Sequence, residues 1–488
     1  MPSYPLNNPA HFITRTVAQW LVGLLLGLGV GTGVTASPVY DFGCLASSES
    51  DLMGRDTVRG LGPVFQNSSR NGVNTFTAFR PFFVHEFDPR TGKENLDVLW
   101  PVAHALWWFN EVDWRFLLAI YEDRDVTDPA SAYRFWLLPV LAVGRNQAGE
   151  NYGAVFPLGG RIDNWFGRDR VEFALFPLYW HSELNDLRTD HYLWPFISRT
   201  TGDDLYRFRV FPFYARSEKK GVGEHRSILW PFWSTVRYDK PGSRGSGFML
   251  FPIYGHAKTE RSETWMFLPP FFRHSTGKAG TENIFLWPII QTQSSEEQDK
   301  FYIWPLYGRR TTAEADRRFW LWPLIWNRTE SQKDRSNHRI RVFPVYQSES
   351  TCLKAEGTPV IDRYVSVWPL ASYERTGGDY KQFRFPDLWP FRDSVAFERN
   401  LTPWWTLYKY ERTPLGREND ILWGLIHWGA KTNGASQGSV FPLASWGRGD
   451  RGGQQKNWDF LKGMVGYRHD DEGTRWQLLY FIHWRNKP

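Results

Sequence analysis

The sequence predicts an all-β protein: one antiparallel meander of about 22 repeated strands, closed into a large β-barrel. Three observations carry this prediction. A short aromatic and proline-containing motif recurs through most of the chain, polar glycine-containing connectors separate its copies, and a leader typical of exported proteins precedes both. The alternative is a soluble β-solenoid or an array of stacked sheets.

The repeated motif is an aliphatic residue, then Trp or Phe, then Pro, then an aliphatic residue or Phe, as in Leu321-Trp322-Pro323-Leu324. Most copies follow one another after 17 to 21 residues. In degenerate copies Ala119, Thr406 and Gly424 stand at the Pro position. The aromatic residues before Pro are the predicted structural and lumen-lining set: Trp194, Phe211, Trp230, Phe251, Trp287, Trp304, Trp322, Phe343, Trp368 and Trp389.

Each unit is expected to be one strand and one connector. Aromatic and β-branched residues favour a pleated surface, and a Pro in the middle of most units excludes helices. Connectors of about eight residues, such as 217–223, suit antiparallel neighbours, because parallel crossovers usually need a dozen residues or more.

Both faces of the expected strand are apolar near its centre. Around Pro212, Val210 and Tyr214 share one face, while Phe211 and Phe213 share the other. A sheet of so many strands, with two faces that avoid water, favours closure, which removes the free edges. Strands of about 9–11 residues and aromatic girdles are typical of outer-membrane barrels.

Two physical arguments oppose a barrel. Pro has no N–H, so each copy in mid-strand would leave a carbonyl without its donor in the hydrocarbon. The apolar part of each strand also covers only about seven positions, or roughly 15 Å after tilting, which is less than the ~25 Å band of a barrel. A soluble exported array would instead bury both faces in protein.

Residues 1–36 read as a signal peptide. Arg15 precedes an apolar, glycine-rich segment at 17–34, and small residues predict cleavage after Ala36. An uncleaved N-terminal anchor is the alternative. Residues 37–75 are expected to be an irregular segment, and residues 76–488 the β-strand repeat domain.

The two cysteines leave two further options open. Cys44 follows Gly43 as in a lipoprotein signal, but Asp41 and Phe42 do not fit that motif. A Cys44–Cys352 disulfide is compatible with an oxidising compartment. Two cysteines are too few for a cysteine-based structural zinc site without His partners.

The motif, together with late copies such as Leu422-Trp423-Gly424 in which Gly replaces Pro, resembles a group of exported bacterial repeat proteins without assigned activity. The resemblance covers about residues 60–484. It implies an envelope location and brings no functional residues.

No catalytic, cofactor-binding or metal-binding motif stands out, and the 12 His residues show no ligand spacing. The net charge of +6 is mixed with acidic residues throughout, which argues against a nucleic-acid partner. We therefore expect a non-enzymatic outer-membrane protein that contacts lipid and passes or holds amphipathic or apolar molecules. The alternatives are a soluble exported protein, periplasmic or extracellular, that binds carbohydrate or a protein partner through an aromatic surface, and an enzyme whose site is assembled from connectors.

Overall fold

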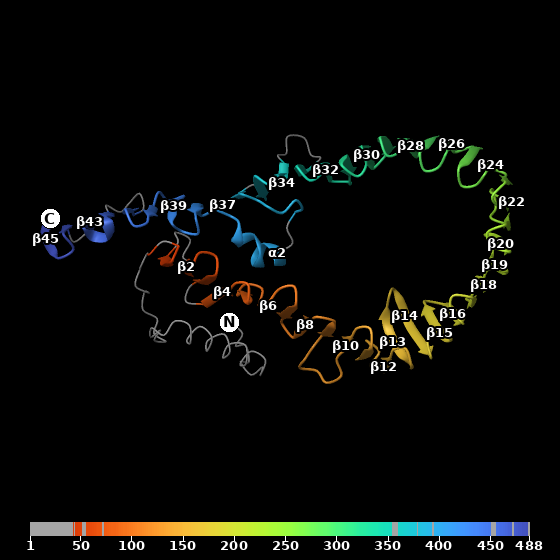
Figure 1. Ribbon diagram of the computed structural model, residues 1–488, viewed down its shortest axis with the longest axis horizontal. Helices are drawn as coiled ribbons and strands as arrows, with labels where there is room; N and C mark the ends of the chain where they lie inside the picture. Colours follow the sequence, from red (N-terminus) through yellow and green to blue (C-terminus); the bar gives the residue numbers. More distant parts are fainter. Residues whose placement is uncertain are drawn as a thin grey trace. The chain divides into compact units, whose positions relative to one another are not determined.

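The computed structural model describes residue 42 and residues 44–50, 55–70, 73–353, 360–377, 379–392, 395–449, 455–470 and 473–486. The predicted leader and its cleavage at Ala36 lie outside these residues. The described chain forms one antiparallel sheet of 45 strands. Each strand pairs with the next one in the sequence, so the sheet is a meander from end to end (Figure 1).

The first third contains β1 (Ala46–Ser50), β2 (Arg55–Gly60), β3 (Phe65–Arg70), β4 (Val73–Phe79), β5 (Phe83–Asp88), β6 (Lys93–Val98), β7 (Ala103–Trp108), β8 (Glu111–Phe116), β9 (Ala119–Asp123), β10 (Tyr133–Leu137), β11 (Leu141–Arg145), β12 (Asn151–Val155), β13 (Gly159–Trp165), β14 (Arg168–Ala174) and β15 (Tyr179–Leu184). The middle third contains β16 (Leu187–Tyr192), β17 (Ile197–Thr201), β18 (Leu205–Val210), β19 (Tyr214–Lys219), β20 (Gly223–Ile228), β21 (Trp233–Tyr238), β22 (Gly245–Leu250), β23 (Tyr254–Thr259), β24 (Ser262–Phe267), β25 (Phe272–Gly277), β26 (Gly280–Phe285), β27 (Ile290–Ser295), β28 (Gln298–Ile303), β29 (Tyr307–Thr312) and β30 (Ala315–Trp320).

The last third contains β31 (Ile325–Ser331), β32 (Arg335–Val342), β33 (Tyr346–Leu353), β34 (Val360–Val367), β35 (Ala371–Thr376), β36 (Tyr380–Phe385), α2 (Val395–Asn400), η1 (Thr402–Trp404), β37 (Tyr408–Thr413), β38 (Gly416–Ile421), β39 (Ile426–Lys431), β40 (Ser436–Val440), β41 (Ala444–Arg448), β42 (Lys456–Phe460), η2 (Leu461–Gly463), β43 (Val465–Asp470), β44 (Gly473–Leu478) and β45 (Ile482–Asn486). No described helix is long and apolar enough to cross a membrane. The sheet starts earlier than expected, because β1–β3 already lie within residues 37–75.

The strand count corrects the sequence analysis. Strands are five to eight residues long, and the motif is not a strand centre but the turn between two strands. β16 ends at Tyr192, Leu193-Trp194-Pro195-Phe196 forms the turn, and β17 begins at Ile197. The Phe196 N–H donates to the Leu193 carbonyl over 2.9 Å, which closes a four-residue β-turn with a cis Trp194–Pro195 bond. Each predicted unit is therefore a hairpin, not a single strand.

The turn position also answers the objection to Pro in a strand. A turn residue need not donate to the ladder, so the missing N–H leaves no gap in a strand pair. The Pro carbonyls in several of these turns accept a bond from the next turn: the Trp194 N–H donates to Pro177 over 2.9 Å, and the Trp230 N–H donates to Pro212 over 2.7 Å. Neighbouring turns are thus joined along the edge of the sheet.

The predicted closure into a barrel is wrong for the described sheet. Among the described residues, β1 pairs only with β2 and β45 only with β44, so the sheet keeps two free edge strands. Closure was expected because both faces looked apolar at the strand centre. Around Pro212, Phe211 and Phe213 lie in the turn, and Val210 and Tyr214 are the strand residues next to it. The rest of the strands carries polar side chains, which water can solvate.

A single sheet of short strands has little interior. Only ten apolar side chains among the described residues are buried. The one cluster of buried apolar residues is formed by Ala142, Ala154, Ile162 and Phe173, on β11 to β14, with Trp136 and Trp180 packed against it. Most of the stability must therefore come from strand pairing and cross-strand contacts, not from a core.

A longer segment that contains α2 and η1 is inserted between β36 and β37. The sequence pattern predicts two motif copies in this segment, at Pro390 and at Thr406. Neither forms a motif turn: Pro386 is the residue with the cis bond, and the Thr406 hydroxyl donates to the Thr402 carbonyl over 3.0 Å at the end of η1. The Phe397 ring on α2 lies 4.6 Å from that of Trp389 and 5.8 Å from that of Trp405, which holds this segment as a compact insertion.

Candidate functional site: the apolar edge of the sheet

The motif turns all lie on one side of the meander. Successive hairpin turns alternate between the two long edges of an antiparallel sheet, and the motif occupies the turns that follow even-numbered strands. Residues 211–213 join β18 to β19, residues 220–222 join β19 to β20 on the opposite edge, and residues 229–232 return to the first edge. We name the side formed by the motif turns the apolar edge.

The residue after Pro is exposed in most of these turns. Phe213 is 61% exposed, Phe232 56% and Ile253 54%, although all three are fully apolar. The same position is exposed in many other turns along the edge: Phe196, Phe271, Ile289, Leu306, Leu324, Val345, Leu370 and Leu443. Exposure of so many apolar groups in one row is unusual for a soluble surface and marks an interaction site.

The predicted lumen aromatics form the body of this edge. Seven of the ten are exposed, and Phe211, Phe251 and Trp368 are half-buried. Rings of adjacent turns touch: Phe211 and Trp230 have centroids 5.6 Å apart, and Trp304 and Trp322 5.9 Å. Their placement on strand centres facing a lumen is wrong, because they lie in turns at the edge of an open sheet. Trp389 belongs to the insertion.

Charge separates the two edges. Motif turns such as residues 229–232 and 321–324 carry no charged side chain, and the nearest charges lie within the strands. The connectors of the opposite edge include Lys220, Lys240 and Glu260. That edge has only scattered exposed apolar residues, such as Phe109 and Phe166. The sheet is therefore amphipathic along its strand direction, from one edge to the other, instead of between its two faces.

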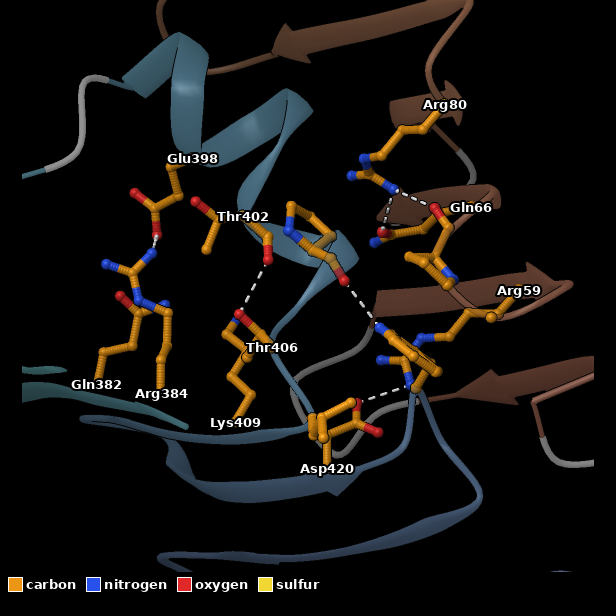
Figure 2. A pocket seen from close by; sticks show the side chains of 15 residues that line it. Arg59, Gln66, Arg80, Gln382, Arg384, Glu398, Thr402, Thr406, Lys409 and Asp420 are labelled. Carbon is orange, nitrogen blue, oxygen red and sulfur yellow. Dashed lines mark hydrogen bonds and ion pairs between the residues drawn. The ribbon is translucent and has the colours of Figure 1, made fainter. Parts of the chain in front are cut away.

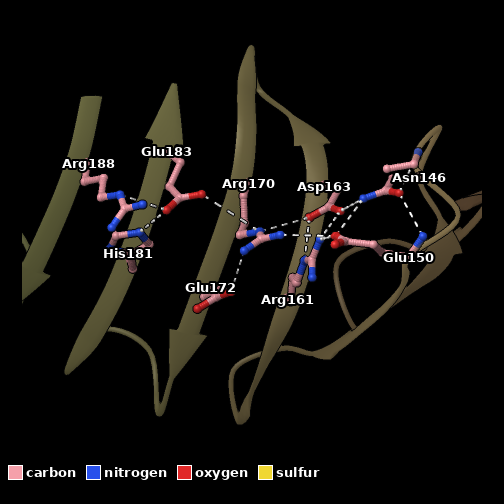
Figure 3. Close-up of polar contacts among 10 residues, drawn as sticks. Asn146, Glu150, Arg161, Asp163, Arg170, Glu172, His181, Glu183 and Arg188 are labelled. Carbon is pink, nitrogen blue, oxygen red and sulfur yellow. Dashed lines mark hydrogen bonds and ion pairs between the residues drawn. The ribbon is translucent and has the colours of Figure 1, made fainter. Parts of the chain in front are cut away.

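The strand faces are polar and internally paired, as Figure 3 shows for β13–β16. Arg161 donates to both carboxylate oxygens of Asp163, over 2.8 and 2.7 Å, and Asn146 donates to Asp163 over 2.7 Å. Burial alone would raise the pKa of Asp163, but these hydrogen bonds outweigh it and lower the pKa. His181 contacts Asp190 over 2.9 Å on the neighbouring strands. Faces of this kind suit water and not hydrocarbon.

One predicted motif copy departs from the apolar rule. In the turn around Pro81, Arg80 occupies the aromatic position, and its side chain is buried. Its Nε donates to the Arg399 carbonyl over 3.0 Å, and its Nη1 donates to the Pro63 carbonyl over 2.9 Å. Burial lowers the pKa of Arg80 to about 10, so the group stays charged at neutral pH.

Arg80 belongs to a set of polar residues that ties the insertion to the first strands; we name Arg80, Glu86, Asp97, Arg399 and Asn400 the clamp. Arg399 on α2 donates from Nε to Asp97 on β6 over 2.9 Å and from Nη1 to Glu86 on β5 over 2.7 Å. Asn400 donates to the same Asp97 over 2.6 Å. Figure 1 shows α2 beside the orange strands β4 and β6. This contact joins residues about 300 positions apart.

Next to the clamp lies a cavity of about 180 Å³ between β2–β4 on one side and β36–β38 with η1 on the other (Figure 2). Its basic groups are already paired: Arg59 contacts Asp420 over 2.7 Å, and Arg384 donates to Glu398 over 2.9 Å. The Trp423 indole N–H donates to the Pro403 carbonyl over 2.8 Å. The cavity therefore lies where β2–β4 come close to β36–β38, and the basic groups named above are paired with acidic neighbours.

The sequence pointed to the residues of the apolar edge but not to their placement, and it missed the clamp. The only local sign of the clamp is Arg80 standing where other copies have Trp or Phe. Cys44 and Cys352 are both free in the structure, so the disulfide option is not realised there. Within the described residues no group of three or more His, Cys, Asp or Glu could hold a metal ion.

Comparison with protein-family models finds no match for this chain, and a search of curated proteins also finds none.

Proposed function

We propose that this protein is a non-enzymatic envelope scaffold that attaches to a lipid membrane, the outer membrane of its cell, along the apolar edge. The observation that carries the proposal is the row of exposed, charge-free turns built from Leu, Trp, Pro and Phe, set against a polar opposite edge. We propose attachment to the membrane surface in place of the membrane-spanning barrel that the sequence predicts.

The chemistry of the edge fits the boundary between lipid headgroups and acyl chains. Trp is enriched at this boundary because its ring is apolar and its N–H is polar, and Leu and Phe favour the adjacent hydrocarbon. A shallow element with an apolar side enters about 5–10 Å at such an interface, which is about the depth of one turn. A sugar-binding site would place polar side chains beside the rings, and the motif turns have none.

Spanning is disfavoured by the same structure. Unpaired edge strands and polar strand faces would leave backbone and charged groups without partners in hydrocarbon. At the edge, by contrast, turn-to-turn hydrogen bonds such as Trp230 to Pro212 already satisfy backbone groups. Only the apolar side chains need to leave water.

Many shallow contacts are enough for firm attachment. Burying one Phe or Ile side chain contributes at most about 1.5–3 kcal/mol. Turns repeat about every 10 Å along the edge, since each hairpin contributes two strands about 4.8 Å apart. Several turns can thus enter a flat membrane together, and their contributions add.

The test is binding of the full chain to phosphatidylcholine vesicles, measured by flotation. We expect the triple variant Phe213→Ser, Phe232→Ser, Ile253→Ser to bind at least tenfold more weakly, because it removes three inserted side chains. The matched control is Phe109→Ser, Phe166→Ser, Leu415→Ser, which removes equally exposed apolar residues from the opposite edge. Equal binding of both variants and the wild type would contradict the proposal.

A second candidate follows from the exposed rings themselves. Trp230 and Trp322 are about half exposed and each contacts a neighbouring ring, so a carbohydrate chain or a protein partner could stack on them. Titration with soluble oligosaccharides, followed by tryptophan fluorescence, distinguishes the two. Saturable quenching that Trp230→Ala abolishes, together with no vesicle binding, would favour this candidate over the lipid surface.

A further inference from the structure

A row of aromatic residues crosses the last five strands and ends on the edge strand β45. The strand register places Trp446, Trp458, Tyr467, Trp476 and Trp484 directly opposite one another across β41–β45. Their rings touch along most of the row: centroids are 6.2 Å apart for Trp458 and Tyr467, 4.8 Å for Tyr467 and Trp476, and 6.4 Å for Trp476 and Trp484. We name these five residues the aromatic row.

The edge beyond the row is unprotected. Among the described residues, β45 pairs only with β44, and all five of its side chains are exposed. Trp484 is 49% exposed and Ile482 42%. The strand contains no Pro, and its single charged residue at neutral pH is Arg485. An edge strand with apolar residues and open backbone groups is a template for another strand.

We propose that β45 pairs with β45 of a second copy of this chain, forming a two-fold symmetric antiparallel dimer centred on Trp484. In this register Trp484 meets Trp484 of the other copy, so the aromatic row continues across the axis. His483 lies opposite Arg485, and Ile482 lies opposite Asn486. The register places no two acidic side chains opposite each other. A two-fold pairing closes on itself, so the β45 edge joins two copies and no more.

The aromatic row indicates which strand pairs with β45. Along β42–β45 each position of the row is filled by an aromatic residue that contacts the next one. The missing neighbour of Trp484 should therefore be a strand with an aromatic residue at its centre. β45 itself meets this requirement and pairs in the antiparallel sense that every strand of this sheet uses.

A five-residue strand pair buries a small area, so we expect a reversible dimer with a dissociation constant in roughly the micromolar range. The test is sedimentation of the full chain without lipid, in the background of Phe213→Ser, Phe232→Ser and Ile253→Ser, so that association through the apolar edge does not contribute. Dimer should appear with rising concentration. Trp484→Lys should abolish it by placing two ammonium groups on the two-fold axis, whereas Trp446→Lys, on the same row but in an inner strand, should leave it intact.

A cross-linking variant keeps the proposal testable if Trp484→Lys disturbs the strand. With Cys44 and Cys352 both changed to Ser, Trp484→Cys should give a disulfide-linked dimer on oxidation, because directly opposed residues have Cβ atoms about 4.5–5.5 Å apart. A control Trp446→Cys should still dimerise but give no disulfide-linked product, because position 446 lies on β41, away from the two-fold axis. Monomer at every concentration, with no cross-linked product from Trp484→Cys, would overturn the proposal.

Discussion

At the scale of single residues, Asp97 is the central acceptor of the clamp. It is fully buried and accepts hydrogen bonds from Arg399 and Asn400, and it contacts His104 over 2.7 Å. Burial by itself would raise the pKa of Asp97, but the hydrogen bonds of His104, Asn400 and Arg399 and the charge of Arg399 outweigh it and lower the pKa. The carboxylate is thus held charged in a place that water does not reach.

Asp97→Asn should destabilise the protein by about 3–5 kcal/mol, because it removes the fully buried carboxylate that pairs with the Arg399 guanidinium and leaves Arg399 paired with the partly exposed Glu86. The measurement is the free energy of unfolding from urea titration. Glu172→Gln, on an exposed carboxylate outside the clamp, is the control and should change it by less than about 0.5 kcal/mol. A small effect of Asp97→Asn would mean that the clamp contributes little to stability.

The direction of the Asp97 pKa shift predicts a pH dependence. The unfolded carboxyl has a pKa of about 3.9 and binds more protons than the folded one at lower pH values, so stability falls as the pH drops from about 4 toward the lower folded pKa. The difference in melting temperature between wild type and Asp97→Asn should therefore be full at pH 7 and shrink toward pH 3. A difference that stays constant over this range would contradict the assigned charge state.

At the scale of elements, the sheet compensates for its thinness by cross-strand contacts. Gly308 on β29 lies directly opposite Phe319 on β30, and the Phe ring covers the glycine backbone. A Cβ built on Gly308 would lie 2.1 Å from a ring carbon of Phe319. Gly438 stands in the same relation to Trp446, at 2.3 Å. In both pairs an aromatic ring packs on the glycine of the neighbouring strand.

Gly308→Ala should destabilise the hairpin of β29 and β30 by about 1–3 kcal/mol, because the new methyl group displaces the Phe319 ring. Hydrogen exchange of these two strands, compared with the wild type, is the measurement. Gly153→Ala on β12 is the matched control, since its nearest neighbour atom would lie at an ordinary 3.6 Å. Equal protection in both variants would show that the ring moves aside freely.

At the scale of the whole molecule, the two edges of the sheet differ in polarity. The polar edge and the polar faces suit contact with water, and the apolar edge is the surface for which we propose contact with lipid. Because the exposed side chains of turns such as 229–232 and 321–324 carry no charge and Arg80 is buried, the net charge of +6 should contribute little to membrane attachment. This separates the proposed mode from attraction of a basic surface to anionic lipid.

Membrane binding should therefore be nearly independent of salt. Raising NaCl from about 0.05 to 0.5 M shortens the Debye length to a few ångströms and should change vesicle affinity less than twofold. Flotation with neutral and with anionic vesicles at both salt concentrations measures this. A strong loss of binding at high salt, confined to anionic vesicles, would mean that basic residues such as Lys220 and not the apolar edge make the contact.

The sequence by itself determined that this protein is an all-β antiparallel meander with a repeat of about 19 residues. Both features are local, since turn and strand preferences repeat with the motif. It did not determine where the motif lies within the hairpin. An apolar turn such as 193–196, flanked by extended residues, has the same composition as the centre of a buried strand, so the pattern predicts one long strand where the chain makes two.

Only the tertiary structure decided the other features. Whether Trp194 or Trp322 faces a lumen or lies on an open edge depends on how successive turns alternate between the edges of the sheet. The contact between Arg399 and Asp97 joins residues 302 positions apart, and no periodicity in the chain specifies such a pair. The physical reason is that local preferences set strands and turns, while edges, free strands and buried ion pairs arise from which distant segments meet.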